Sequence, residues 1–159
     1  MYYAWSYTSP LGKIELLSDE NYLLGAWLLG QKYYYAKYQT KTVCYTQNDI
    51  LTKACLWLEQ YFANEKPKPL TSLKPTGTVF QQQVWQVLTK IDYGQTISYK
   101  DIAKVLKMEH GYQAIGQAVG RNPLLIFIPC HRVLTNDKKI SGYAAGINNK
   151  KWLLKFEQS

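Results

Sequence analysis

The strongest candidate for chemistry in this chain is a cysteine followed directly by a histidine, Cys130 and His131. They follow the most apolar run in the second half of the chain, residues 124–129. A thiolate is a strong nucleophile and a neutral imidazole can take its proton, so the pair suggests nucleophilic catalysis. In an extended chain neighbouring side chains point to opposite faces, so His131 would need a bend or a water molecule to reach the sulfur.

Two other interpretations of Cys130 remain open on these residues alone. A buried cysteine is often an inert part of a hydrophobic core. Cysteine and histidine are also zinc ligands, but the remaining candidates, His110, Cys44 and Cys55, show no close ligand-pair spacing. The sequence therefore predicts no metal site.

The composition predicts an ordinary globular protein. The chain has 159 residues, 47% of them hydrophobic and 19% charged, enough for one large domain or two small ones. No apolar run approaches the ~18 residues that suggest a membrane span, and the N-terminus lacks the pattern of a signal peptide. With only three cysteines, we expect a reducing, cytoplasmic location and no membrane partner.

The charge is unevenly distributed along the chain. Residues 1–74 carry 8 basic and 6 acidic side chains, whereas residues 75–159 carry 11 basic and 5 acidic ones. The excess of positive charge in the second half suggests a polyanionic partner, most simply a nucleic acid.

The first 74 residues have the pattern of a small α/β domain. Apolar and β-branched runs predict antiparallel strands over residues 2–8, 13–17 and 22–29, with a tight turn at 9–12. A helix is predicted over 49–63, capped by Asn48, with Cys55 in its apolar stripe as a core residue. The tyrosines of residues 33–38 could stack on bases, but packed or loop tyrosines are the simpler interpretation. Three prolines and a glycine in 65–77 indicate a linker, so we divide the chain into domains 1–74 and 75–159.

The second domain is predicted to be mainly helical. Capping boxes at Thr78 and Ser98 begin helices, the second of which runs over 99–106, and a further short helix follows over 113–120. Two short helices separated by a few residues resemble a helix-turn-helix. The outer residues of the last helix are Ala, Gly and Gln, which suit close approach to DNA with little base reading. The alternative is a helix that packs on a neighbour through its small face.

The residues around Cys130 also resemble a known family. Residues 128–133, Ile-Pro-Cys-His-Arg-Val, match the PCHRV active-site signature of the O6-alkylguanine-DNA alkyltransferases. Further matches in the family's order are the segments 77–80, 84–85, 93–94, 97–99, 118–123, 141–143 and 152–157. The first 74 residues resemble the family only in the order of their predicted elements, strands followed by a helix.

The resemblance implies a fold and an activity. The fold class would be α+β, with a small ribonuclease-H-like antiparallel sheet plus helix, then a mainly helical, winged-helix-like DNA-binding domain with a helix-turn-helix. The activity would be DNA repair by direct reversal. The damaged nucleotide would be flipped out of the duplex, and its alkyl group would be transferred from guanine O6 to the protein. The transfer would be irreversible, so each protein molecule would react once. The substrate would be double-stranded DNA containing O6-alkylguanine, and the protein a monomer without a cofactor.

The same resemblance implies roles for the catalytic residues. Cys130 would be the acceptor, His131 the base acting through water, and Glu157 the group that orients the histidine. Asn122 would fix the backbone next to the active-site segment. Tyr99 would donate a hydrogen bond to the departing purine.

Other residues would bind the substrate and the DNA. The Val133 carbonyl would accept the guanine amine, and the N–H of Ala144, next to Tyr143, would face O6. The predicted DNA contacts are Gln113, Ala114, Lys100 and Arg121. Gln113 departs from the family, which has an arginine there to fill the gap left by the flipped base.

Two other functions compete with this interpretation. The alkyltransferase-like proteins bind alkylated DNA without transfer, but they lack the acceptor cysteine that this chain has at position 130. An ordinary helix-turn-helix regulator is the second alternative. Transfer of an alkyl group to Cys130 would separate the first function from both.

Overall fold

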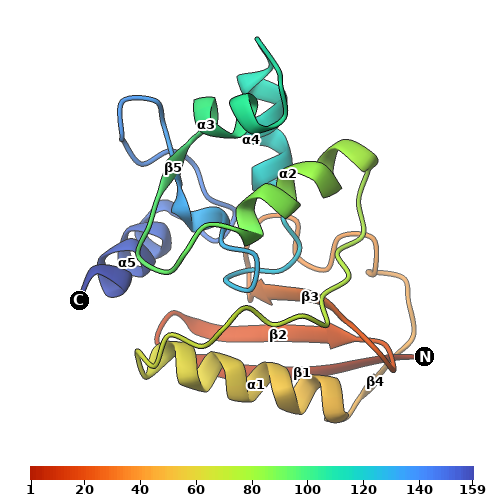
Figure 1. Ribbon diagram of the computed structural model, residues 1–159. Coiled ribbons are helices and arrows are strands. Elements are labelled where there is room, and N and C mark those ends of the chain that lie inside the picture. The colour runs from red at the N-terminus through yellow and green to blue at the C-terminus, as the bar shows by residue number, and fades with distance from the viewer. The chain divides into compact units, whose positions relative to one another are not determined.

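The computed structural model describes all residues, 1–159, which form two compact units (Figure 1). The first unit contains Met1–Thr76 with Pro123–Phe127, and the second contains Gly77–Asn122 with Ile128–Ser159. Residues 123–127 lie within the predicted second domain, 75–159, but they cluster with the first unit. Their backbone explains this, because Ala26 N donates to Pro123 O over 2.8 Å and Leu125 N donates to Ala26 O over 3.0 Å.

The first unit is built on a four-stranded sheet in the order β3-β2-β1-β4. Strands β1 (Tyr2–Ser9), β2 (Gly12–Ser18) and β3 (Leu23–Leu28) are antiparallel, as predicted. The short strand β4 (Val43–Tyr45) was not predicted; it pairs with β1 in parallel and adds one parallel edge strand to an otherwise antiparallel sheet. A three-residue strand is too short to give a periodic signal.

Helix α1 (Asp49–Phe62) lies along one face of this sheet (Figure 1). Asn48 caps it as predicted: its Oδ1 accepts from Leu51 N over 2.9 Å, and its Nδ2 donates to Ser18 Oγ over 3.0 Å. The cap therefore also ties the helix to the end of β2. Cys55 is only half-buried, so its predicted place in the core was wrong.

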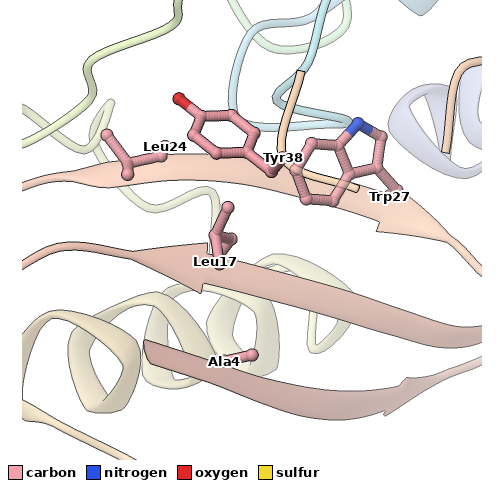
Figure 2. Close-up of a cluster of buried hydrophobic side chains, with 5 residues drawn as sticks. All are labelled: Ala4, Leu17, Leu24, Trp27 and Tyr38. Atoms are coloured by element: carbon pink, nitrogen blue, oxygen red, sulfur yellow. The ribbon is translucent and has the colours of Figure 1, made fainter. Parts of the chain in front are cut away.

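An apolar cluster in the first unit contains Ala4, Leu17, Leu24, Trp27 and Tyr38, all buried (Figure 2). The Tyr35 ring stacks on Trp27 with 4.7 Å between ring centroids. Tyr34 and Tyr35 are half-buried against the cluster, so the interpretation of the 33–38 tyrosines as packed residues is confirmed for them.

The second unit is mainly helical. It contains α2 (Val79–Thr89), α3 (Tyr99–Val105), α4 (Tyr112–Gly120) and α5 (Ile147–Gln158). The predicted capping boxes at Thr78 and Ser98 are both present. A parallel pair, β5 (Ile97–Ser98) with β6 (Val133–Leu134), joins the start of α3 to the segment that follows the 3-10 helix η1 (Cys130–Arg132). No helix is long and apolar enough to cross a membrane.

Trp85 fixes helix α4 in the second unit. Its ring is buried on α2, and its Nε1 donates to Ala118 O of α4 over 2.8 Å. A Cβ atom added at Gly77 would lie 2.4 Å from this ring, so a larger residue does not fit at this position without a shift of the ring. Helices α2, α3 and α4 pack against one another, so this hydrogen bond supports the whole helical group.

We expect Trp85→Phe to lower the free energy of unfolding by about 1–2 kcal/mol, because the hydrogen bond to Ala118 O is lost while most of the ring contact stays. Chemical denaturation of the wild type and the variant measures this. Trp152→Phe is the matched control, since Trp152 is 36% exposed on α5. Equal losses in both variants would contradict the role of the bond.

Candidate active site

Cys130 and His131 lie in the first two positions of η1, so the chain is bent rather than extended at this point. Two backbone hydrogen bonds hold the bend: Cys130 N donates to Ile128 O over 2.8 Å, and Arg132 N donates to Pro129 O over 3.0 Å. Cys130 is 6% exposed and His131 is fully buried. Of the two alternatives expected from the sequence, a bend or a water molecule, the structure contains the bend.

Asn122 fixes the chain just before this turn. It is buried at the end of α4, and its Nδ2 donates to Ile128 O over 2.8 Å. This bond joins the helical group to the active-site turn, and it is the kind of backbone contact expected for Asn122 from the sequence.

Glu157, near the C-terminal end of α5, receives four donors. His131 Nε2 lies 2.6 Å from its Oε2, and Gly94 N donates to its Oε1 over 3.1 Å. Arg132 donates twice, from Nε to Oε1 over 2.8 Å and from Nη2 to Oε2 over 3.1 Å. Both carboxylate oxygens are thus used, and the side chain is 1% exposed.

Arg132 was not assigned a role from the sequence, although it stands inside the signature. Besides its two bonds to Glu157, its Nη1 donates to Ile91 O over 2.7 Å, and its guanidinium lies 5.7 Å from the Tyr93 ring centroid. The arginine therefore connects η1, α5 and the segment after α2. A buried arginine is stable only beside an anion. The sequence did not reveal this role because only the fold shows that Arg132 is buried.

The pKa of Glu157 is shifted by opposing effects. Burial acts to raise this pKa, but the hydrogen bonds and charges of His131 and Arg132 outweigh it and hold the pKa well below its ordinary value of 4.5. The carboxylate is therefore ionised at neutral pH, and it forms the negative side of the His131 pair.

His131 has the properties of a base. Burial lowers its pKa, with opposition from Glu157, so the ring is favoured in its neutral form. Because Nε2 donates to Glu157, the lone pair of the neutral ring lies on Nδ1. This Nδ1 is buried and has no hydrogen-bond partner in the protein.

Burial raises the pKa of the Cys130 thiol. Polar contacts with Asn122 and Tyr143 and the charge of Lys150 act in the opposite direction. The thiol therefore needs a base to become nucleophilic, and its surroundings favour the thiolate once the proton has gone.

Residues assigned to the substrate surround the same turn. Val133, fully buried, follows η1 directly, and its pairing with Ile97 brings the start of α3 alongside. Tyr99, the first residue of α3, has its hydroxyl 2.6 Å from Ser141 Oγ. Tyr143 and Ala144 are half-buried in the same loop as Ser141. The fold thus assembles Tyr99 and the 141–144 loop next to the segment that bears the cysteine.

The predicted DNA contacts lie outside this cluster. Gln113 and Ala114 are exposed in the first turn of α4, Lys100 is exposed on α3, and Arg121 is exposed at the end of α4. No group of His, Cys, Asp or Glu side chains that could bind a metal ion is present.

Comparison with known proteins agrees with this geometry. The family models of the 6-O-methylguanine DNA methyltransferase match the chain twice, the ribonuclease-like domain at residues 1–74 and the DNA binding domain at residues 79–159. A methylated-DNA–protein-cysteine methyltransferase of Methanosarcina acetivorans is 39% identical over 100% of this chain and 99% of its own length. A crystal structure of Mycobacterium tuberculosis OGT in complex with DNA has a TM-score of 0.87 and 34% identity, covering 98% of this chain and 92% of that one.

The chain therefore belongs to the 6-O-methylguanine DNA methyltransferase family, as the sequence resemblance indicated. Its activity is DNA repair by alkyl transfer, that of a methylated-DNA–protein-cysteine methyltransferase.

We expect Glu157→Gln to slow alkyl transfer and to lower the free energy of unfolding by about 3 kcal/mol at pH 7, because Arg132 loses its buried countercharge. The wild-type pKa of Glu157 is depressed, so its stabilisation is complete above pH 4.5 and decreases as the pH falls below that value. The stability difference between wild type and variant should therefore shrink on acidification. Chemical denaturation at several pH values measures this stability difference. Glu65→Gln, at an exposed glutamate, is the control. A difference that does not change with pH would contradict the ion-pair role of Glu157.

Proposed function

We propose that Cys130 is the residue that accepts the alkyl group from O6 of guanine, with His131 as its base and Glu157 as the group that orients the base. One observation carries this proposal: the buried His131 has Nε2 held by Glu157, while its buried Nδ1 has no protein partner. A water molecule between Nδ1 and the sulfur would satisfy the nitrogen and carry the thiol proton to it.

The transfer is an in-line displacement at the alkyl carbon. His131 takes the thiol proton through water, the sulfur forms a bond to the carbon, and the bond from that carbon to O6 breaks. The bonding electrons pass to the purine, which then takes up a proton and becomes guanine. Glu157 stabilises the histidinium formed on the way. The product is a thioether, which has no thiol left, so each molecule reacts once.

Tyr99 is the residue we assign to the departing purine. Its hydroxyl is held by Ser141 Oγ at 2.6 Å, which fixes its direction at the edge of the cysteine segment. A hydrogen bond from this hydroxyl to the purine would stabilise the developing negative charge. The Val133 carbonyl and the Ala144 N–H would hold the exocyclic groups of guanine.

The DNA would be bound by α3 and α4, acting as a helix-turn-helix. These helices pack together, and the exposed residues near their ends include Lys100, Gln113 and Arg121. The excess of positive charge in residues 75–159 also supports DNA binding by this part of the chain. Because Cys130 is buried in the protein, a guanine stacked in the duplex has to be flipped out to bring its O6 to the sulfur.

A non-catalytic binder of alkylated DNA is less well supported, since this chain has both the cysteine and its base. The monomeric state and cytoplasmic location expected from the sequence stay predictions.

We expect Cys130→Ala to abolish alkyl transfer and to leave DNA binding unchanged, because the buried thiol is the acceptor and is not needed for contact with the groove. Mass spectrometry after incubation with O6-methylguanine DNA would show a methylene-sized gain on Cys130 of the wild type only. Cys44→Ala, at an exposed cysteine, is the matched control and should react like the wild type. Transfer by the Cys130 variant would refute the assignment.

We expect Gln113→Arg to speed repair of O6-methylguanine in duplex DNA, with little effect on free O6-benzylguanine, which needs no flipping. Arginine adds a charged hydrogen bond where the flipped base leaves a gap, worth on the order of 1.5–3 kcal/mol. Single-turnover rates on both substrates at two salt concentrations measure the effect.

Gln117→Arg is the matched control for this prediction, since Gln117 is exposed one turn later on α4. It adds the same charge, so a pure phosphate effect would appear in both variants and steepen the salt dependence by about one unit. Equal gains on duplex and free base would refute the flipping role of position 113.

A further inference from the structure

An exposed tyrosine begins helix α4, one of the two helices that we propose as the DNA contact. Tyr112 is the first residue of this helix, and at 41% exposure it is the most exposed aromatic side chain of the second unit. No hydrogen bond, ion pair or ring contact in the structure holds its side chain. A large apolar ring is therefore presented to solvent at the end of α4 without a partner in the protein.

The residues around Tyr112 are small. Gly111 directly before it has a φ of +107°, a value in the left-handed region that favours glycine. Ala114 is exposed in the same turn, and Gly116 is half-buried in the next one. The tyrosine ring therefore extends beyond the surface of its neighbours, and no bulky side chain beside it would keep α4 away from a DNA groove.

Tyr112 is also close to the place where the substrate is expected. A Cβ atom added at Gly116 would lie 3.7 Å from Cε1 of Tyr99, so α4 passes beside the Tyr99 ring at this point. Tyr112 and Gly116 are four residues apart and share one side of the helix. Four helical residues rise about 6 Å, so Tyr112 stands one turn from the residue that we assign to the departing purine.

A flipped nucleotide leaves a gap in the base stack. Proteins that open a base step often insert an apolar side chain into it, and an aromatic ring has the additional advantage of stacking on the neighbouring bases. Gln113, which follows Tyr112 and is also exposed, can form a hydrogen bond with an orphaned base but has no ring to stack. The two adjacent side chains are thus suited to two different tasks in the same gap.

We propose that Tyr112 enters the base stack in place of the flipped nucleotide and stacks on the base pairs that flank the gap. The inference rests on the proposed function, in which α4 contacts DNA and a guanine is flipped out to reach Cys130. Tyr112 acts on the flipping of the nucleotide and takes no part in the transfer of the alkyl group. It is therefore required only when the damaged guanine starts from inside a duplex.

The test uses three substrates that differ in how the damaged base is held. They are a duplex containing O6-methylguanine, the same damaged strand alone, and free O6-benzylguanine. Single-turnover rates of transfer to Cys130 are measured at saturating concentration for the wild type, Tyr112→Ala and Tyr112→Phe. Tyr22→Ala is the matched control, because Tyr22 is 40% exposed in the first unit and undergoes the same substitution.

We expect Tyr112→Ala to slow transfer from the duplex about tenfold, since the loss of base–aromatic stacking is of this order. Its rates with the single strand and with the free base should stay within about twofold of the wild type. Tyr112→Phe keeps the ring and should react like the wild type, as should Tyr22→Ala, with all three substrates.

Three results would overturn the proposal. Equal losses with all three substrates would indicate a structural defect, so the free-base rate also tests whether the variant is folded. Equal losses with the duplex and the single strand would indicate a general DNA contact. A Tyr112→Phe variant as slow as Tyr112→Ala would show that the hydroxyl group, and not the ring, is the active part.

A double-mutant cycle with Gln113→Arg gives an independent measurement. If Tyr112 fills the gap, an arginine at position 113 has more space and more effect once the ring is gone. We therefore expect Gln113→Arg to increase the duplex rate by a larger factor in the Tyr112→Ala background than in the wild type. Equal factors in both backgrounds would refute a shared gap.

The proposed function and this inference fail in different ways. If the wild type transfers no alkyl group to Cys130 from any of the three substrates, the proposed function is refuted. If the wild type transfers normally and Tyr112→Ala is equally fast on the duplex, only the role of Tyr112 is refuted.

Discussion

The second unit depends on one buried carboxylate. Glu157 accepts from His131, from Arg132 and from the backbone of Gly94, so a single side chain of α5 joins the active-site turn to the segment that follows α2. A buried carboxylate is tolerated only when its lone pairs and its charge are satisfied. One of these contacts also fixes the orientation of His131, the residue that we propose as the base. Stability and the proposed reactivity therefore rest on the same contacts, and Arg132, the fourth residue of the PCHRV signature, serves mainly stability.

Charge and burial act together on the site. Glu157 is ionised and holds His131, which follows Cys130 directly in η1. Burial alone would keep both the thiol and the imidazole neutral at rest. In the reaction that we propose, the thiolate forms only when His131 takes the thiol proton, and the charge of Glu157 then stabilises the histidinium. Pre-oriented groups of this kind need little rearrangement during the reaction.

Much of the local structure followed from the sequence because its signals are local. Asn48, Thr78 and Ser98 were predicted as helix caps, and each accepts the expected backbone N–H. The three antiparallel strands followed from apolar runs and one tight turn. Strand β4 escaped because three residues show no periodicity, and residues 123–127 were assigned to the second domain because backbone pairing with Ala26 leaves no trace in composition. Cys55 lies on the apolar side of α1 by spacing, yet the packing leaves it half-buried.

The sequence by itself determined the family, through the signature around Cys130 and the matches that follow it in order. It also indicated the partners in the site, since Cys130, His131 and Glu157 stand at the matching positions. Only the tertiary structure decided how these residues meet: η1 bends the chain at the cysteine and histidine, and α5 brings Glu157 Oε2 to within 2.6 Å of His131 Nε2. The contacts of Arg132 were also decided there. Its importance comes from burial, which turns an ordinary surface charge into one that needs a partner, and no short stretch of sequence records burial.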